Sequence, residues 1–181
     1  VNINAKNDCP VVDLNTNSTS DFSTIFVEQG AKVNVTSSNV SITDVDNTTQ
    51  NWTAKVELTN AFALDSLFKS GNVGSLTIGN PDYTTIPGKI SITISGTGTG
   101  SELASAISGI KFKTGSNNPD LTPRVITIDV SDDATPACKV STVSTVNINA
   151  KNDCPIVDLN TNSTSDFSTI FVEQGAKVNV T

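Results

Sequence analysis

Apolar and polar residues alternate along much of this chain, and this period of two is typical of half-buried β-strands. The alternation is clearest over residues 52–59 and 89–95, where every second side chain is apolar. Similar segments lie between Gly, Pro, Asn and Asp residues and predict ten strands, over residues 11–14, 22–28, 31–36, 40–43, 52–59, 75–78, 89–95, 110–113, 124–130 and 139–149. Many short strands between turn residues favour an antiparallel β-sandwich over alternating strands and helices.

One segment has the spacing of a helix instead. Over residues 101–108, Ser101 can cap the first turn, and Leu103, Ala104 and Ile107 fall on one side. We predict a short helix there that crosses between strands. The run GTGTGS at residues 96–101 lacks the lysine and the helix context of a phosphate-binding loop, and we interpret it as a flexible turn.

The first 36 residues are repeated at the end of the chain. Residues 1–36 and 146–181 are identical at 35 of 36 positions, with Val11 replaced by Ile156. The offset of 145 residues is the size of a domain that buries its own core, so we predict a tandem array of self-contained copies. Residues 1–9 are then a linker and the start of a repeat, 10–149 a complete copy, and 150–181 the junction and first strands of the next copy.

Composition limits the chemistry that such a copy can perform. The chain has no His and no Met, 16% of its residues are charged, and its net charge is −7. A negative surface disfavours nucleic acid and anionic lipid as partners. No apolar run approaches the roughly 20 residues that span a bilayer, so we expect no membrane insertion by this segment. Because no nucleophile has a histidine base, we predict that the protein is not an enzyme.

Three motifs together resemble a known family. They are the boundary NDCPVVDLN (residues 7–15), the run ITDVDN (42–47), and the segment 102–134, which contains NPDLTPR. In this order they resemble the cadherin-like and immunoglobulin-like repeats of very large bacterial surface proteins, over nearly the whole repeat. The resemblance implies a Greek-key β-sandwich with serial copies at the cell surface, roles in adhesion or as stalks, and often calcium at the junctions.

A sandwich of this kind brings oxygen ligands to the pole where the chain enters. If the last strand leads toward the next copy, the loop before that strand returns to the entrance pole and brings Asp132 there. The other oxygen-bearing residues expected at this pole are Asn7, Asp8, Asp44 and Asp46. Hard oxygen donors from several loops suit Ca²⁺, which takes about six to eight of them. The alternative is that these residues only form turns and strand ends, where Asp and Asn are favoured in any case.

The resemblance also implies a ligand at the opposite pole. Glu28 matches the acidic residue that cadherin-like repeats offer to the following junction. It would lie beside Asn152 and Asp153, which repeat Asn7 and Asp8. We therefore predict Ca²⁺ at the junctions between copies as the only cofactor.

The repeat also explains the odd number of cysteines, because Cys154 repeats Cys9 and each copy owns two. The turn before the last strand places Cys138 near Cys9, whereas a strand of about ten residues, or roughly 33 Å, separates Cys138 from Cys154. A disulfide requires Cα atoms within about 7 Å. We predict a Cys9–Cys138 disulfide and a Cys154 that awaits a partner in the next copy. The alternative is a pair of buried free thiols.

Asn-x-Ser/Thr sequons are candidate glycosylation sites in a secreted chain. They occur at Asn17, Asn34, Asn39, Asn47, Asn51, Asn162 and Asn179. Asn34 lies between Val33 and Val35, and it points outward if these valines point inward. The alternative for all of these positions is plain polar surface.

Two functions fit this sequence. In the first, each copy is a structural unit of an extracellular fibre, stalk or filament, and its partners are adjacent copies, joined in one covalent array or completed by strand addition between chains. In the second, each copy binds a glycan or a protein, and the array supplies avidity. Aromatic residues, which stack on sugars, make up only 5% of the chain, so we favour the structural role.

Overall fold

The computed structural model describes residues 6–15, 21–84, 88–134, 137–155, 157, 169–170, 173 and 177. The chain divides into two compact units, Val1–Lys151 and Asn152–Thr181. All of the strands and the helix found in the described ranges belong to the first unit.

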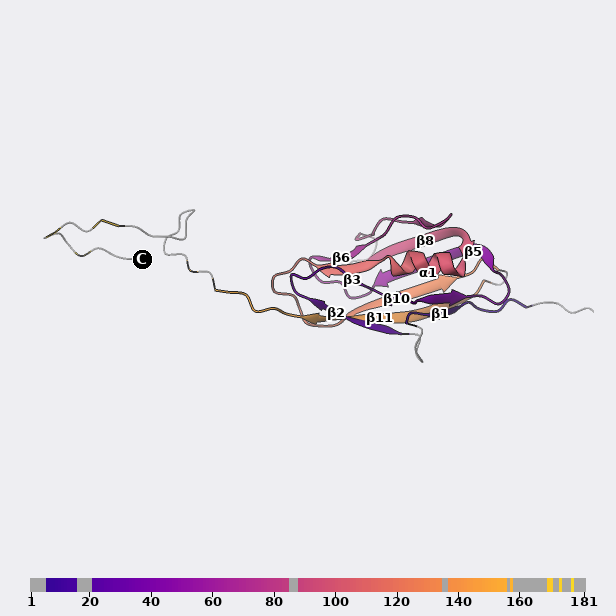
Figure 1. Ribbon diagram of the computed structural model, residues 1–181, viewed down its shortest axis with the longest axis horizontal. Coiled ribbons are helices and arrows are strands. Elements are labelled where there is room, and N and C mark those ends of the chain that lie inside the picture. The colour runs from indigo at the N-terminus through magenta and orange to yellow at the C-terminus, as the bar shows by residue number, and fades with distance from the viewer. Residues whose placement is uncertain are drawn as a thin grey trace, which may run out of the picture. The chain divides into compact units, whose positions relative to one another are not determined.

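The first unit is built of β-strands and one short helix (Figure 1). In chain order its elements are β1 (Val11–Asp13), β2 (Phe22–Val27), β3 (Val33–Asn34), β4 (Ser41–Thr43), β5 (Thr49–Leu58), β6 (Asp65–Phe68), β7 (Thr77–Ile78), β8 (Ile90–Thr99), α1 (Gly100–Ser108), β9 (Lys111–Thr114), β10 (Arg124–Ser131) and β11 (Lys139–Asn149). The predicted all-β fold with one short helix is confirmed. Each of the ten predicted strands has a counterpart at its position.

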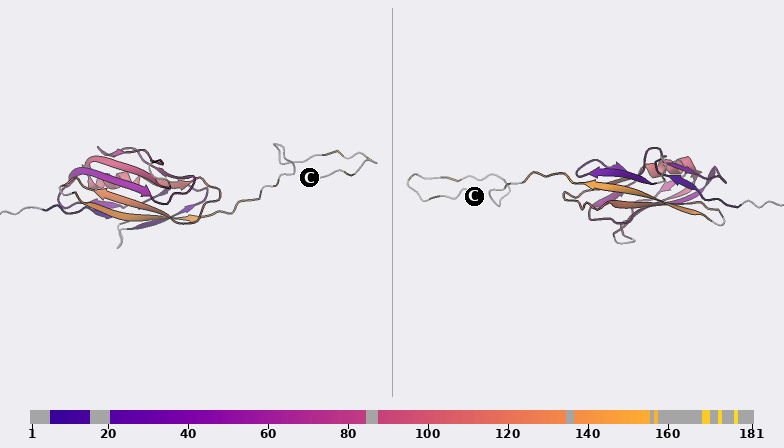
Figure 2. Two further views of the ribbon diagram at one scale, coloured as in Figure 1. Left: turned by 180° about the vertical axis from the view of Figure 1, so that it is seen from behind. Right: turned by 90° about the horizontal axis from the view of Figure 1, so that it is seen from below.

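Two of the three sheets pack face to face around one core. The larger has the strand order β2-β11-β10-β5-β8-β7, the second β3-β9-β6, and β1 pairs with β4. All described strand pairs are antiparallel except β2 with β11, where Ser144 lies opposite Phe22. Phe26 of β2 meets Phe112 of β9 edge-on, with ring centroids 5.7 Å apart, across the core. Seen from behind, the larger sheet faces the viewer with α1 on its far side (Figure 2).

Strands β5 and β8 form the centre of the larger sheet, paired from Thr49 opposite Thr99 to Leu58 opposite Ile90. The Trp52 indole is buried, and its Nε1 donates to Gly98 O at 3.0 Å, which satisfies the one polar atom of the ring. The apolar residues that alternate along both strands are all buried: Trp52, Ala54, Val56 and Leu58 from β5, and Ile90, Ile92 and Ile94 from β8.

The prediction of a flexible turn at residues 96–101 is wrong. Strand β8 continues through Thr99, and residues 96–99 pair with the first four residues of β5. The glycines there permit close packing instead. Gly96 has a φ of 136°, and a Cβ at this position would lie 2.6 Å from Ser75 O. Repeated glycines in a strand therefore mark close approach of another segment here, not a loop.

The N-cap of helix α1 lies two residues before its predicted position. Thr99, rather than Ser101, is the N-cap: its Oγ1 accepts from Glu102 N at 3.2 Å, and Glu102 Oε2 accepts from Thr99 N at 2.8 Å. This reciprocal capping box satisfies two donors that an uncapped helix would leave free. The predicted apolar face of the helix is buried and packs against β4, β5 and β8.

Strand β6 is the one described strand that the sequence did not predict. It is only four residues long and begins with Asp65, which is buried. Arg124 Nε of β10 donates to Asp65 Oδ2 at 2.7 Å, and the two side chains are 1% and 0% exposed. Arg124 also donates to Asp120 O at 2.9 Å, and its guanidinium lies 4.1 Å from the centroid of the Phe62 ring. The pair thus ties the three-stranded sheet to the larger one.

An ion-pair cluster on β5 predicts that stability depends on pH. Glu57 accepts hydrogen bonds from Lys55 Nζ and, at 2.9 Å, from Lys89 Nζ, and these two lysines hold the pKa of Glu57 below its ordinary value. The folded state thus binds this proton more weakly than the unfolded state does. The cluster therefore stabilises the fold above the ordinary glutamate pKa, and this stability is lost as the pH falls through the lowered value.

We expect Glu57→Gln to remove this acid-dependent contribution, about 1 kcal/mol or less because both lysines are partly exposed. The measurement is urea unfolding of both proteins at neutral and at acid pH. A variant that loses as much stability on acidification as the original chain would contradict the assignment.

Candidate functional site

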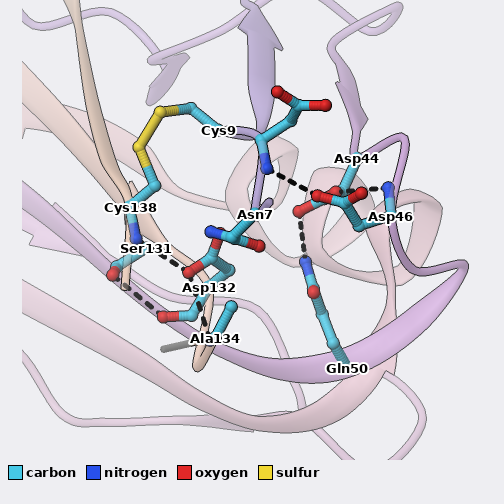
Figure 3. Close-up of a disulfide and its surroundings, with 10 residues drawn as sticks. Asn7, Cys9, Asp44, Asp46, Gln50, Ser131, Asp132, Ala134 and Cys138 are labelled. Atoms are coloured by element: carbon cyan, nitrogen blue, oxygen red, sulfur yellow. Dashed lines mark hydrogen bonds between the residues drawn. A yellow bond between two sulfur atoms is a disulfide. The ribbon is translucent and has the colours of Figure 1, made fainter. Parts of the chain in front are cut away.

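The entrance pole is the end of the unit where residues 7–9 lead into β1 and where β10 turns into β11 (Figure 3). A disulfide joins Cys9 to Cys138 there, with Cα atoms 5.1 Å apart and a sequence separation of 129. The predicted pairing is confirmed, and the alternative of two free thiols is wrong. Cys154 is exposed and forms no disulfide within the described residues, and its pairing with a later copy stays a prediction.

Asp132 organises the loop beside the disulfide. It is 4% exposed, and its Oδ1 accepts from Cys138 N at 2.9 Å and from Ala134 N at 3.3 Å. Its Oδ2 accepts from Asn7 Nδ2 at 3.0 Å, which fixes the incoming chain to the β10–β11 loop. The sequence prediction that Asn7 and Asp132 meet at this pole agrees with these contacts.

A second set of contacts links the loop after β4 to the same pole. Asp8 N donates to Asp46 Oδ2 at 2.6 Å, and Asp46 N donates to Asp44 Oδ1 at 2.9 Å. Gln50 Nε2, buried at the start of β5, donates to Asp44 Oδ2 at 2.9 Å. Gln50 is not among the predicted site residues, because its only signal in the sequence is its position two residues before Trp52, on the same inward face of the strand.

These contacts bear on the predicted calcium ligands at the entrance pole. The carboxylates of Asp132, Asp44 and Asp46 accept hydrogen bonds from backbone and side-chain N–H groups. These hydrogen bonds occupy part of the acceptor capacity of the three carboxylates, and Ca²⁺ takes six or more oxygens. Within the described ranges, no three His, Cys, Asp or Glu residues are grouped so that they could hold a metal ion. Calcium at this pole stays a prediction.

Glu28 lies at the other end of the unit, which we call the exit pole, where the chain leaves β11. Its side chain is 2% exposed, its N donates to Asn149 O at 2.9 Å, and its Oε2 accepts from Lys151 N at 2.8 Å. The other oxygen, Oε1, is buried and has no hydrogen-bond partner among the residues that the structure describes. Glu28 thus fixes the departing chain, as Asn7 and Asp132 fix the incoming one. Asn152 and Asp153 are exposed residues of the second unit.

Four of the seven sequons lie on the described surface. Asn34, Asn39, Asn47 and Asn51 are exposed, and Asn34 points outward from β3 next to the buried Val35. Asn51 is engaged by neighbours, because its Nδ2 donates to Asp133 Oδ2 at 2.9 Å. The remaining sequon asparagines, Asn17, Asn162 and Asn179, lie outside the described residues. Glycosylation stays a prediction at all seven.

A groove of about 340 Å³ lies between α1 and the loop and strand at β4. Hydroxyl groups dominate its lining, which consists of Ser38, Val40, Ser41, Ile42, Thr43, Ser101, Ala104, Ser105 and Ser108. A sugar could form hydrogen bonds to such a surface, but none of these residues is an aromatic on which a sugar ring would stack.

Comparison with known proteins gives no relative: no family model, no curated protein and no solved structure matches the chain. In the part of the chain that the structure describes, the helix is too short to cross a bilayer.

Proposed function

We propose that this chain is a repeat unit of an extracellular fibre, stalk or filament, with a structural role and no catalysis. The observation that carries the proposal is the position of the incoming and outgoing chain in a complete copy. The incoming chain is fixed by Cys9 beside the first residue of β11, and the outgoing chain is fixed by Glu28 just beyond its last residue. Copies with this layout can be joined in series, and the recurring sequence that starts at Val146, within β11, continues into the next copy.

Within this proposal we place the fold among Greek-key sandwiches of the cadherin-like or immunoglobulin-like kind. The support is the pair of facing, mainly antiparallel sheets and the last strand that leads out of the unit. The disulfide supports a location outside the cytoplasm, because such bonds persist in oxidising compartments. We therefore assign the fibre to the cell surface, where the exposed sequons would be available for glycans.

Two kinds of connection between copies follow from the repeated segment. Strands β1, β2 and β3 all lie within the 36 residues that recur at 146–181. In a covalent array, the second set of these strands belongs to the next copy of the same chain. In a strand-complemented filament, it would complete a copy in another chain, because a segment identical at 35 of 36 positions fits the places that β1, β2 and β3 take in the first copy.

Calcium belongs to the proposal as an inter-copy ligand near Glu28. The buried Oε1 of Glu28, which has no hydrogen-bond partner among the described residues, is the observation that favours it, because an unpaired buried carboxylate oxygen is costly unless a donor or a cation meets it.

A density map of the native assembly tests the proposal, with one sample in calcium buffer and one in EDTA. We expect successive globules with one copy of 145 residues each, and density beside Glu28 that disappears in EDTA together with some of the stiffness of the fibre. Isolated globules without serial neighbours would overturn the structural role. A fibre that is unchanged in EDTA would refute the calcium site but not the structural role.

The alternative function is a module that binds a glycan or a protein by avidity. The hydroxyl-lined groove at α1 is the observation that favours it. The same map separates the two functions, since a binding module would show ligand density in the groove of each copy, whereas a structural unit would show none.

A further inference from the structure

We propose that the Cys9–Cys138 disulfide routes tension around the fold, so that a stretched copy carries load along β11 and does not unfold. The usefulness of this property to a fibre rests on the proposed function. The limit on extension itself does not, because it follows from the bond positions within one unit.

The covalent path through a copy has two branches. Cys9 is the last incoming residue before the buried Pro10 and β1, and its disulfide leads directly to Cys138, one residue before β11. Both branches rejoin at Cys138, and from there the path runs along β11 to Lys151. The longer branch contains the rest of the fold, which the disulfide closes into a loop with a sequence separation of 129. Tension follows the shorter branch, because the longer one is slack between two Cα atoms that are 5.1 Å apart.

Strand β11 is suited to carry that load. It is an inner strand of the larger sheet, with β10 paired along Lys139–Val146 and β2 paired along Ser144–Asn149. A strand already spans about 3.3 Å per residue, and a fully stretched chain reaches at most about 3.6 Å, so β11 can lengthen by less than about 10 Å. Glu28 holds Lys151 at its far end. Pulling therefore tightens β11 along its own axis and does not peel it from the sheet.

The repeat extends this path from copy to copy. Cys154 repeats Cys9 and comes 16 positions after Cys138. If each copy forms the equivalent disulfide, only the 17 residues from Cys138 to Cys154, of every 145, lie on the load-bearing path. The array would then be nearly inextensible, because most of each folded copy lies outside the covalent path that bears the tension.

Single-molecule force spectroscopy on the full 181-residue chain, held at its two ends, tests this. We use Cys154→Ser as the background in every measurement, which prevents exchange with the free thiol. In the oxidised chain we expect no unfolding step of the first unit longer than about 10 Å. After addition of a thiol reductant during the pull, we expect a single added length of roughly 430–460 Å, because about 129 residues join the path at 3.3–3.6 Å each.

The reductant measurement starts from the folded, oxidised molecule, so it does not depend on whether a cysteine-free variant folds. Cys9→Ser with Cys138→Ser, where it folds, should give the long step without reductant. An oxidised chain that lengthens by hundreds of ångströms before any reductant is present would overturn the proposal, as would a step that reductant leaves unchanged. A native assembly without serial copies would refute the fibre but leave this extension limit intact.

Discussion

Replacing Arg124 with methionine will lower the free energy of unfolding by about 3–5 kcal/mol, because the change leaves the Asp65 carboxylate buried without its counter-charge. Both side chains are essentially inaccessible, and the contact is a direct 2.7 Å hydrogen bond between charged groups. The replacement also removes the donor to Asp120 O and the cation that lies over the Phe62 ring. Urea unfolding monitored by circular dichroism measures the loss.

Two comparison variants separate burial from charge. Lys139→Met breaks the Asp129–Lys139 pair, whose side chains are 24% and 61% exposed, and should cost under about 1 kcal/mol. The double variant Asp65→Leu with Arg124→Met should recover part of the loss, since it removes both buried charges together. If Arg124→Met costs no more than Lys139→Met, the buried pair does not hold the two sheets together.

Removing the disulfide with Cys9→Ala and Cys138→Ser will lower the free energy of unfolding by about 2–5 kcal/mol, toward the upper end because the closed loop is long. The bond constrains the unfolded chain over a separation of 129 residues. In the folded state it also holds Asn7 against Asp132 and Asp8 against Asp46. Equilibrium urea unfolding of the oxidised original chain and of the variant measures the difference.

Cys154→Ser is the matched control for the disulfide, because Cys154 is an exposed free thiol and its removal should leave stability unchanged. Mass spectrometry after alkylation of the native chain provides the second check. It should find one blocked position, at Cys154, and none at Cys9 or Cys138. Alkylation of all three thiols without reductant would show that the bond does not form.

The alternation of apolar residues was sufficient to predict the strands that build the centre of the fold. Strands β5 and β8 alternate over many residues, so their buried faces could be assigned before any coordinates. Strand β6 could not, because it has four residues and places a charged side chain, Asp65, inward. An inward carboxylate is recognisable only once its partner Arg124 is known, and the two lie 59 positions apart in sequence.

The candidate site was predictable to the level of which loops meet. A last strand that leads outward returns the preceding loop to the entrance, and this rule was enough to pair Cys9 with Cys138 and to bring Asn7 to Asp132. The same rule cannot predict individual hydrogen bonds, such as the one that the buried Gln50 donates to Asp44. The GTGTGS run was misjudged because glycine permits both a turn and close approach of a neighbouring segment, and only the packing partner, Ser75, distinguishes the two.

The buried indole that donates to Gly98 O has a practical consequence for work on longer forms of this protein. Trp52 is the single tryptophan of the chain, and it lies outside the 36 residues that recur. If the proposed array repeats the whole copy, each copy carries one tryptophan at an equivalent place. Its emission will move to longer wavelength when water reaches the ring, so the fraction of copies that have melted can be followed optically without attaching a dye.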